Sequence, residues 1–260
     1  MMLQEPQQSD YDLGFELLGF RVRVHWGFWI AAAVLGWNWS TGLAVFGTAQ
    51  GFDTPPAPVL LLVWIAAVFV SILVHELGHT LAFRYYGHSS RILLYHFGGL
   101  AIPTSFGSWN GARAQRLGSV ENLVIAAAGP ALQLALAAAV IGLGVMLKVP
   151  MTILFFSIEG APQESITTYA VFDALLYPSV FWAILNLAPI LPLDGGRIMQ
   201  SILEILNVNR PSYSAHVVSI GAAAVIGLYF MSNGRPFAGL MFLMFAGSNW
   251  QAMQYGGRGY

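Results

Sequence analysis

Long apolar stretches dominate the chain, and short polar joints separate them. A membrane-spanning helix needs about 20 predominantly apolar residues. Six stretches approach that length: roughly 26–46, 59–83, 120–147, 169–188, 215–231 and 237–254. The joints at 48–58, 149–168 and 232–236 are rich in Gly, Pro and Asn. The pattern therefore predicts a polytopic membrane protein with about six transmembrane helices.

Two segments have the spacing of strands rather than of helices. Residues 20–26 alternate apolar and polar side chains with a period of two. Residues 91–102 are rich in β-branched and aromatic side chains and are interrupted by Gly98 and Gly99. Non-helical backbone at membrane depth is tolerated only where protein buries it or water fills a cavity. We therefore expect an otherwise all-α fold with a small re-entrant β-sheet.

Composition supports the membrane class. Hydrophobic residues make up 57% of the chain and charged residues only 9%, whereas a soluble domain carries about 25% charged residues. The net charge of −1 offers no basic field for nucleic acid. The absence of cysteine excludes disulfides and thiolate metal ligands. The first twenty residues are too acidic for a secretory signal peptide, so we expect insertion through an internal segment.

Arginine and lysine predict the orientation, because cytoplasmic loops carry an excess of both. With six alternating helices and a cytoplasmic N-terminus, nine arginines fall inside, whereas Lys148 and Arg235 fall outside. Both termini are therefore predicted to be cytoplasmic, and the multi-pass chain is expected in a prokaryotic plasma membrane. The expected organisation is a tail and strand at 1–25, one membrane-embedded catalytic domain at 26–254, and a tail at 255–260.

The sequence H-E-L-G-H at 75–79 is the strongest chemical signal. It follows a charge-free run, 59–74, in which Ser71 is the one hydroxyl. Ionisable side chains are costly there and mark functional sites. His75 and His79 lie one helical turn apart on one face, so they can share one Zn²⁺. Glu76 is then the candidate general base, but a catalytic zinc needs a third protein ligand.

Only five aspartates are available for that ligand. Asp10 and Asp12 lie in the tail, and Asp53 and Asp173 fall near the predicted outer side. Asp194 follows the inner end of the fourth helix, at the predicted depth of the histidine pair. Prolines before it break the helix and glycines after it free the backbone. Asp194 is therefore the candidate third ligand, although a turn residue before Gly-Gly is the alternative.

These motifs resemble the site-2 protease family of intramembrane metalloproteases. The resemblance rests on H-E-L-G-H at 75–79 followed by N-x-x-P-x-x-P-L-D-G-G at 186–196. A-G-P at 128–130 is similar to the family's intervening element, and F-G-G at 97–99 to its re-entrant glycine strand. The resemblance covers roughly residues 20–205. The family often continues G-P-x-x-N, whereas this chain has the longer amide of Gln133.

The resemblance implies a zinc endopeptidase that cuts transmembrane or membrane-adjacent segments of other proteins near the cytoplasmic face. It implies one zinc per chain, held by His75, His79 and Asp194, with Glu76 as general base. Asn186 would hold substrate backbone or the tetrahedral intermediate, although it could instead satisfy a broken helix end. The implied partners are a transmembrane protein substrate and the lipid bilayer; the oligomeric state stays open.

The strand candidate at 91–102 suggests how such a substrate would bind. A transmembrane helix must unwind before a protease can attack a carbonyl, and its backbone then needs new hydrogen-bond partners. An exposed strand edge supplies them by β-augmentation. We therefore expect substrate to bind along this segment, where Gly98 and Gly99 allow close approach.

Other functions compete with the protease hypothesis. A zinc-binding transporter or channel would carry polar residues across the full depth of several helices, whereas the ionisable groups here cluster at one end. A pseudo-protease would bind membrane helices without cutting them. The histidine pair could also hold a structural metal.

Overall fold

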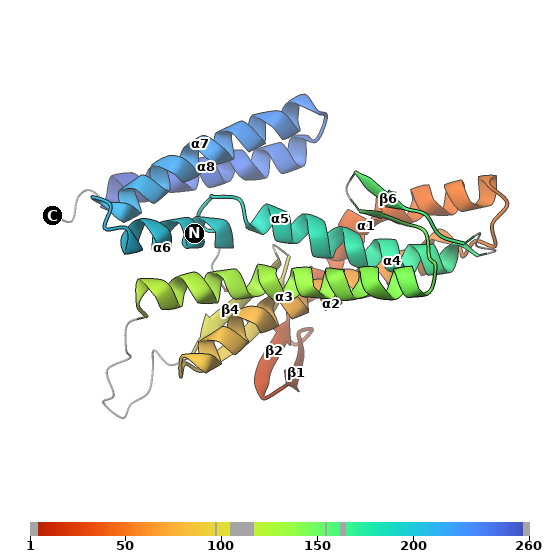
Figure 1. Ribbon diagram of the computed structural model, residues 1–260, viewed down its shortest axis with the longest axis horizontal. Coiled ribbons are helices and arrows are strands. Elements are labelled where there is room, and N and C mark those ends of the chain that lie inside the picture. The colour runs from red at the N-terminus through yellow and green to blue at the C-terminus, as the bar shows by residue number, and fades with distance from the viewer. Residues whose placement is uncertain (1–4, 97, 105–116, 154, 162–164, 257–260) are drawn as a thin grey trace. The chain divides into compact units, whose positions relative to one another are not determined.

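The computed structural model describes residues 5–96, 98–104, 117–153, 155–161 and 165–256 (Figure 1). Packing divides them into two units: 5–104 with 131–183, and 117–130 with 184–256. The helices are α1 (Trp26–Ala49), α2 (Ala57–Tyr85), α3 (Ser119–Met146), α4 (Ile166–Tyr177), the π-helical turn η2 (Pro178–Trp182), α5 (Ala183–Asn186), α6 (Asp194–Ile205), α7 (Pro211–Ser232) and α8 (Pro236–Gly256). The strands are β1 (Leu13–Leu17), β2 (Phe20–Val24), β3 (Ser90–Tyr95), β4 (Gly98–Pro103), β5 (Met151–Ile153) and β6 (Phe156–Ile158).

A four-stranded sheet, in the order β1-β2-β3-β4, belongs to the first unit. β1 pairs antiparallel with β2, β2 pairs parallel with β3, and β3 pairs antiparallel with β4. The strand predicted at 20–26 is confirmed over 20–24 as β2, whereas His25 caps α1 and Trp26 begins it. The expectation of one strand over 91–102 is wrong, because the chain turns after Tyr95 and Gly98 lies opposite it. β3 is consequently an inner strand and β4 an outermost one.

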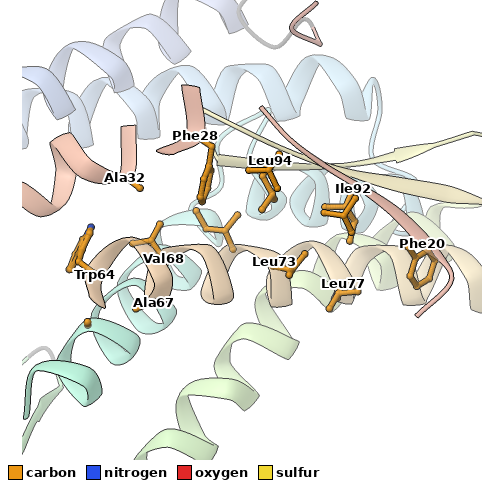
Figure 2. Packing of buried hydrophobic residues seen from close by; sticks show 14 residues of the cluster. Phe20, Phe28, Ala32, Trp64, Ala67, Val68, Leu73, Leu77, Ile92 and Leu94 are labelled. Carbon is orange, nitrogen blue, oxygen red and sulfur yellow. The ribbon is translucent and has the colours of Figure 1, made fainter. Parts of the chain in front are cut away.

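The core of the first unit lies between this sheet and helices α1 and α2 (Figure 2). The period-two pattern of β2 buries Phe20, Val22 and Val24 against that core. β3 contributes Ile92 and Leu94 to the same cluster. α2 also packs against α4 and β4. One helix therefore supports both the sheet and the neighbouring helices, and it carries the H-E-L-G-H sequence.

A small hairpin occupies part of the joint predicted at 149–168. β5 and β6 pair antiparallel over three residues each, and Val149 and Met151 pack into a cluster with Phe172 of α4. Ser165 caps the N-terminus of α4 by accepting from the Thr167 amide. The sequence did not predict these strands because three residues are too few to show a period.

The second unit contains α6, α7 and α8. α7 and α8 lie side by side and run in opposite directions (Figure 1). A side chain at Gly239 would overlap the backbone of Gly227, so glycine permits this close approach. Ile190, Ala223 and Phe242 form the buried cluster of this unit.

Five helical segments among the described residues are long and apolar enough to cross a membrane: α1, α2, α3, the continuous stretch from α4 to α5, and α7. This measure therefore finds five of the six predicted spans. The sixth stretch does form α8, but polar side chains such as Asn249 interrupt its apolar character. The chain is an integral membrane protein of mostly helical fold. Predictions for Phe97, Arg113, Arg116 and 257–260 lie outside the described residues.

Candidate metal centre

The two histidines of α2 face one another inside the first unit. His75 and His79 are 4% and 7% exposed, and their Nε2 atoms lie 3.1 Å apart. Two nitrogens that each lie about 2.05 Å from a tetrahedral zinc ion are separated by about 3.3 Å. The observed spacing therefore fits two imidazoles that share one ion.

Glu76 lies against the outermost strand of the sheet. Its side chain is 5% exposed. A Cβ added at Gly99 would overlap the Glu76 Cγ, Cδ and Oε1 atoms. At Gly98 an added Cβ would meet nothing, but φ is +123°, which L side chains rarely adopt. The two glycines thus differ: Gly98 permits the backbone turn into β4, and Gly99 leaves space for the carboxylate.

Tyr95 ends β3 close to this carboxylate. It is buried, and burial together with the negative charge of Glu76 raises the pKa of its phenol to about 12. The phenol therefore stays protonated at physiological pH and remains a hydrogen-bond donor. The sequence did not single out Tyr95, because the β-branched and aromatic composition of 91–102 indicates a strand without showing which side chains lie near Glu76.

Gln133 of α3 contacts the first histidine directly. Its Oε1 lies 2.9 Å from His75 Nδ1, and its side chain is fully buried. The sequence singled out Gln133 only as a departure from the G-P-x-x-N pattern. No signal in a single sequence links it to a histidine 58 residues away.

Asp194 belongs to the second unit, where it is the first residue of α6 and is 9% exposed. A Cβ at Gly195 would overlap the Leu187 carbonyl, and one at Gly196 would overlap the Ile190 backbone. Only glycine permits this close approach of α6 to the segment before it. Asn186 is half-buried at the end of α5, eight residues before Asp194.

Helices α7 and α8 fix the segment that leads to Asp194. The Leu191 amide donates to Ser219 Oγ of α7 (2.9 Å). The Leu191 carbonyl accepts from Asn249 Nδ2 of α8 (2.6 Å), and Asn249 Oδ1 lies 2.8 Å from His216 Nδ1. Buried polar side chains thus satisfy both the N–H and the C=O of Leu191, which lies three residues before Asp194. This explains why two apolar helices carry Ser219 and Asn249 inside.

One group of metal-binding side chains stands out among the described residues: His75, His79 and Asp194. The first two belong to the first unit and Asp194 to the second. Zinc commonly binds imidazole nitrogens and carboxylate oxygens, and this group offers two of the former and one of the latter. Three protein ligands are also the usual number at a catalytic zinc. The donor set therefore fits zinc.

Comparisons with known proteins point the same way. Residues 63–230 match peptidase family M50. A zinc metalloprotease of Methanocaldococcus jannaschii is 27% identical over 191 residues, which is 73% of this chain and 44% of that protein. A predicted zinc metalloprotease of Synechocystis sp. strain PCC 6803 is 29% identical over 155 residues, or 58% of this chain and 34% of that protein. The chain thus spans less than half the length of these curated relatives.

A solved structure shares the fold. The site-2 protease from Methanocaldococcus jannaschii superimposes with a TM-score of 0.54 at 20% identity, covering 94% of this chain and 95% of that one. The family match extends over more than half of the chain and includes the H-E-L-G-H helix and the D-G-G turn. This chain therefore belongs to peptidase family M50.

Proposed function

We propose that the chain is an intramembrane zinc endopeptidase that cuts transmembrane or membrane-adjacent segments of other proteins near the cytoplasmic face. One observation carries this proposal. Two histidine Nε2 atoms 3.1 Å apart and a buried glutamate lie on one helix that is long and apolar enough to cross a membrane. Ionisable groups are costly at such a place, and a hydrolytic site accounts for all three.

In this proposal His75, His79 and Asp194 hold one zinc ion per chain. When bound, zinc supplies a Lewis acid that polarises the scissile carbonyl and makes a water acidic. Glu76 would accept a proton from the attacking water as its oxygen bonds to the scissile carbonyl carbon, and would pass that proton to the amine nitrogen as the C–N bond breaks. Asn186 binds the substrate backbone close to the reacting carbonyl, where an amide donor stabilises developing negative charge.

Strand β4 is the proposed docking edge for the unwound substrate. β4 is an outermost strand of the sheet. Among the described residues, β3 pairs with one of its two edges. An extended peptide that adds to the other side gains backbone hydrogen bonds. Gly98 and Gly99 begin this strand, and Gly99 lies against Glu76. A peptide paired there would lie near the general base.

The proposed orientation counts α8 as a sixth span and places both termini in the cytoplasm of a prokaryotic plasma membrane. It rests on the nine arginines that the sequence assigns to one side, against Lys148 and Arg235 on the other. The partners would be the bilayer and a transmembrane substrate protein, whose cleavage releases a fragment to the cytoplasmic side.

Purified protein in proteoliposomes, presented with a panel of single-span membrane proteins, tests the proposal. We expect cleavage within or beside a span that stops when a chelator removes zinc and returns when zinc is restored. Zinc flux without cleavage would instead indicate a transporter. Zinc-dependent binding of spans without cleavage would indicate a pseudo-protease.

Replacing Gly99 by valine is expected to abolish cleavage without loss of zinc. The new side chain would displace the Glu76 carboxylate, which Gly99 contacts, whereas the histidines remain fixed on α2. The measurement is cleavage rate together with zinc content. Gly14→Val is the matched control, because Gly14 lies on the other outermost strand, β1, and a Cβ there meets nothing. Normal cleavage by Gly99→Val would remove β4 from the site.

A further inference from the structure

A buried polar cluster lies on the far side of the His75 ring from His79. It consists of Ser71 and His75 of α2, Gln133 of α3, and the Pro178 carbonyl and Ser179 of η2, all in the first unit. Gln133, Ser71 and Ser179 have no exposed surface. Such groups are costly in an apolar helix interior unless they serve one another or a site.

The hydrogen bonds fix how the Gln133 amide is oriented. One end lies 2.9 Å from Ser71 Oγ and 3.4 Å from the Pro178 carbonyl. A backbone carbonyl can only accept, so this end must be the NH₂ group. Ser179 donates to Ser71 at 3.0 Å and holds that hydroxyl in place. The other end, Oε1, therefore faces His75 Nδ1 at 2.9 Å.

The orientation of the amide determines the proton on the histidine. An amide oxygen can only accept, so His75 Nδ1 must carry a hydrogen. The Nε2 of such a neutral imidazole carries no hydrogen, and this is the form that binds a metal. That Nε2 is the atom 3.1 Å from His79 Nε2. The cluster thus fixes both the tautomer of His75 and the direction in which its ring points.

We infer that Gln133 is a positioning residue, which holds His75 as the Nδ1–H tautomer and presents its Nε2 to the metal. Ser71, the one hydroxyl in the apolar run before His75, takes part by holding the amide. The inference rests on the proposed function only in taking His75 as a zinc ligand. Hydrogen-bond partners of this kind typically contribute about 10–100-fold to metal affinity.

Two readouts test this role without any activity assay. Long-range ¹H–¹⁵N spectra of the metal-free protein, labelled at histidine, report the His75 tautomer; we expect hydrogen on Nδ1 in the wild type and loss of that single tautomer in Gln133→Leu. Competition with a chromophoric chelator reports zinc affinity, and we expect Gln133→Leu to bind about 10–100-fold more weakly. Gln133→Glu should restore most of the affinity, because a carboxylate oxygen still accepts from Nδ1–H.

Ser40→Ala is the matched control, since Ser40 is a buried hydroxyl of the same unit that donates to the Trp37 carbonyl within α1. It should leave zinc affinity unchanged. Hydrogen on Nε2 of wild-type His75, or equal affinity of Gln133→Leu and wild type, would overturn the inference. If Gln133→Leu fails to fold, the wild-type tautomer and the Gln133→Glu affinity still decide. Absence of cleavage with the expected tautomer and affinities would refute the proposed protease function alone.

Discussion

Replacing Glu76 by glutamine is expected to slow cleavage by about 10²–10⁴-fold while zinc content stays at the wild-type level. Glutamine has nearly the same shape and fits beside Gly99, where Glu76 packs. It cannot accept a proton, so the attacking water is no longer activated. The histidines carry the metal and are unchanged. The measurement is the cleavage rate of a transmembrane substrate, with zinc determined by elemental analysis on the same sample.

Glu121→Gln is the matched control for this substitution. Glu121 is a half-buried glutamate in the first turn of α3 that accepts from the Gly118 amide at 2.8 Å, a bond that glutamine can also accept. Its replacement should leave both cleavage and zinc unchanged. Full activity of Glu76→Gln would contradict the role of general base, and loss of zinc from it would show that Glu76 is itself a ligand.

Asp194→Asn is expected to lower zinc affinity by more than about 100-fold. Removing a residue that only hydrogen-bonds to a metal ligand typically lowers the affinity by about 10–100-fold. The neutral amide is a much poorer zinc ligand than a carboxylate, and only two imidazoles would remain. Cleavage should disappear with the metal and return in part at high zinc concentration. Chelator competition measures the affinity directly.

Asp173→Asn serves as the comparison for Asp194→Asn. Asp173 is a carboxylate of α4 that accepts from Trp39 Nε1 at 2.8 Å, and an asparagine oxygen can accept the same bond. Zinc affinity should therefore be unchanged in Asp173→Asn. If the two variants bound zinc equally well, Asp194 would be a turn residue before Gly-Gly rather than a ligand.

Features with a local cause were predictable from the sequence. The spacing of His75 and His79 on a helix, the alternation in β2, and the proline-broken approach to Asp194 each follow from neighbouring residues. α3 also begins and ends close to the predicted bounds, because its apolar run is long. Such patterns survive folding, since burial of the apolar face is what stabilises each element.

Features that depend on contacts between distant segments were not predictable. β1 lies in an acidic tail and is a strand because it pairs with β2. Gln133 reaches His75 only when α3 packs on α2, and nothing in the local sequence marks that contact. The same holds for Gly99, whose missing side chain matters because of Glu76. Nor does the local sequence of α8 show that its buried Asn249 donates to the Leu191 carbonyl of another segment.

X-ray absorption at the zinc edge of the purified, zinc-loaded protein shows directly whether His75, His79 and Asp194 hold the ion. We expect one zinc per chain with two imidazoles and light-atom ligands at about 2.0–2.2 Å, and a shell that loses an oxygen ligand in Asp194→Asn. Sub-stoichiometric zinc, or an identical zinc shell in wild type and Asp194→Asn, would contradict it.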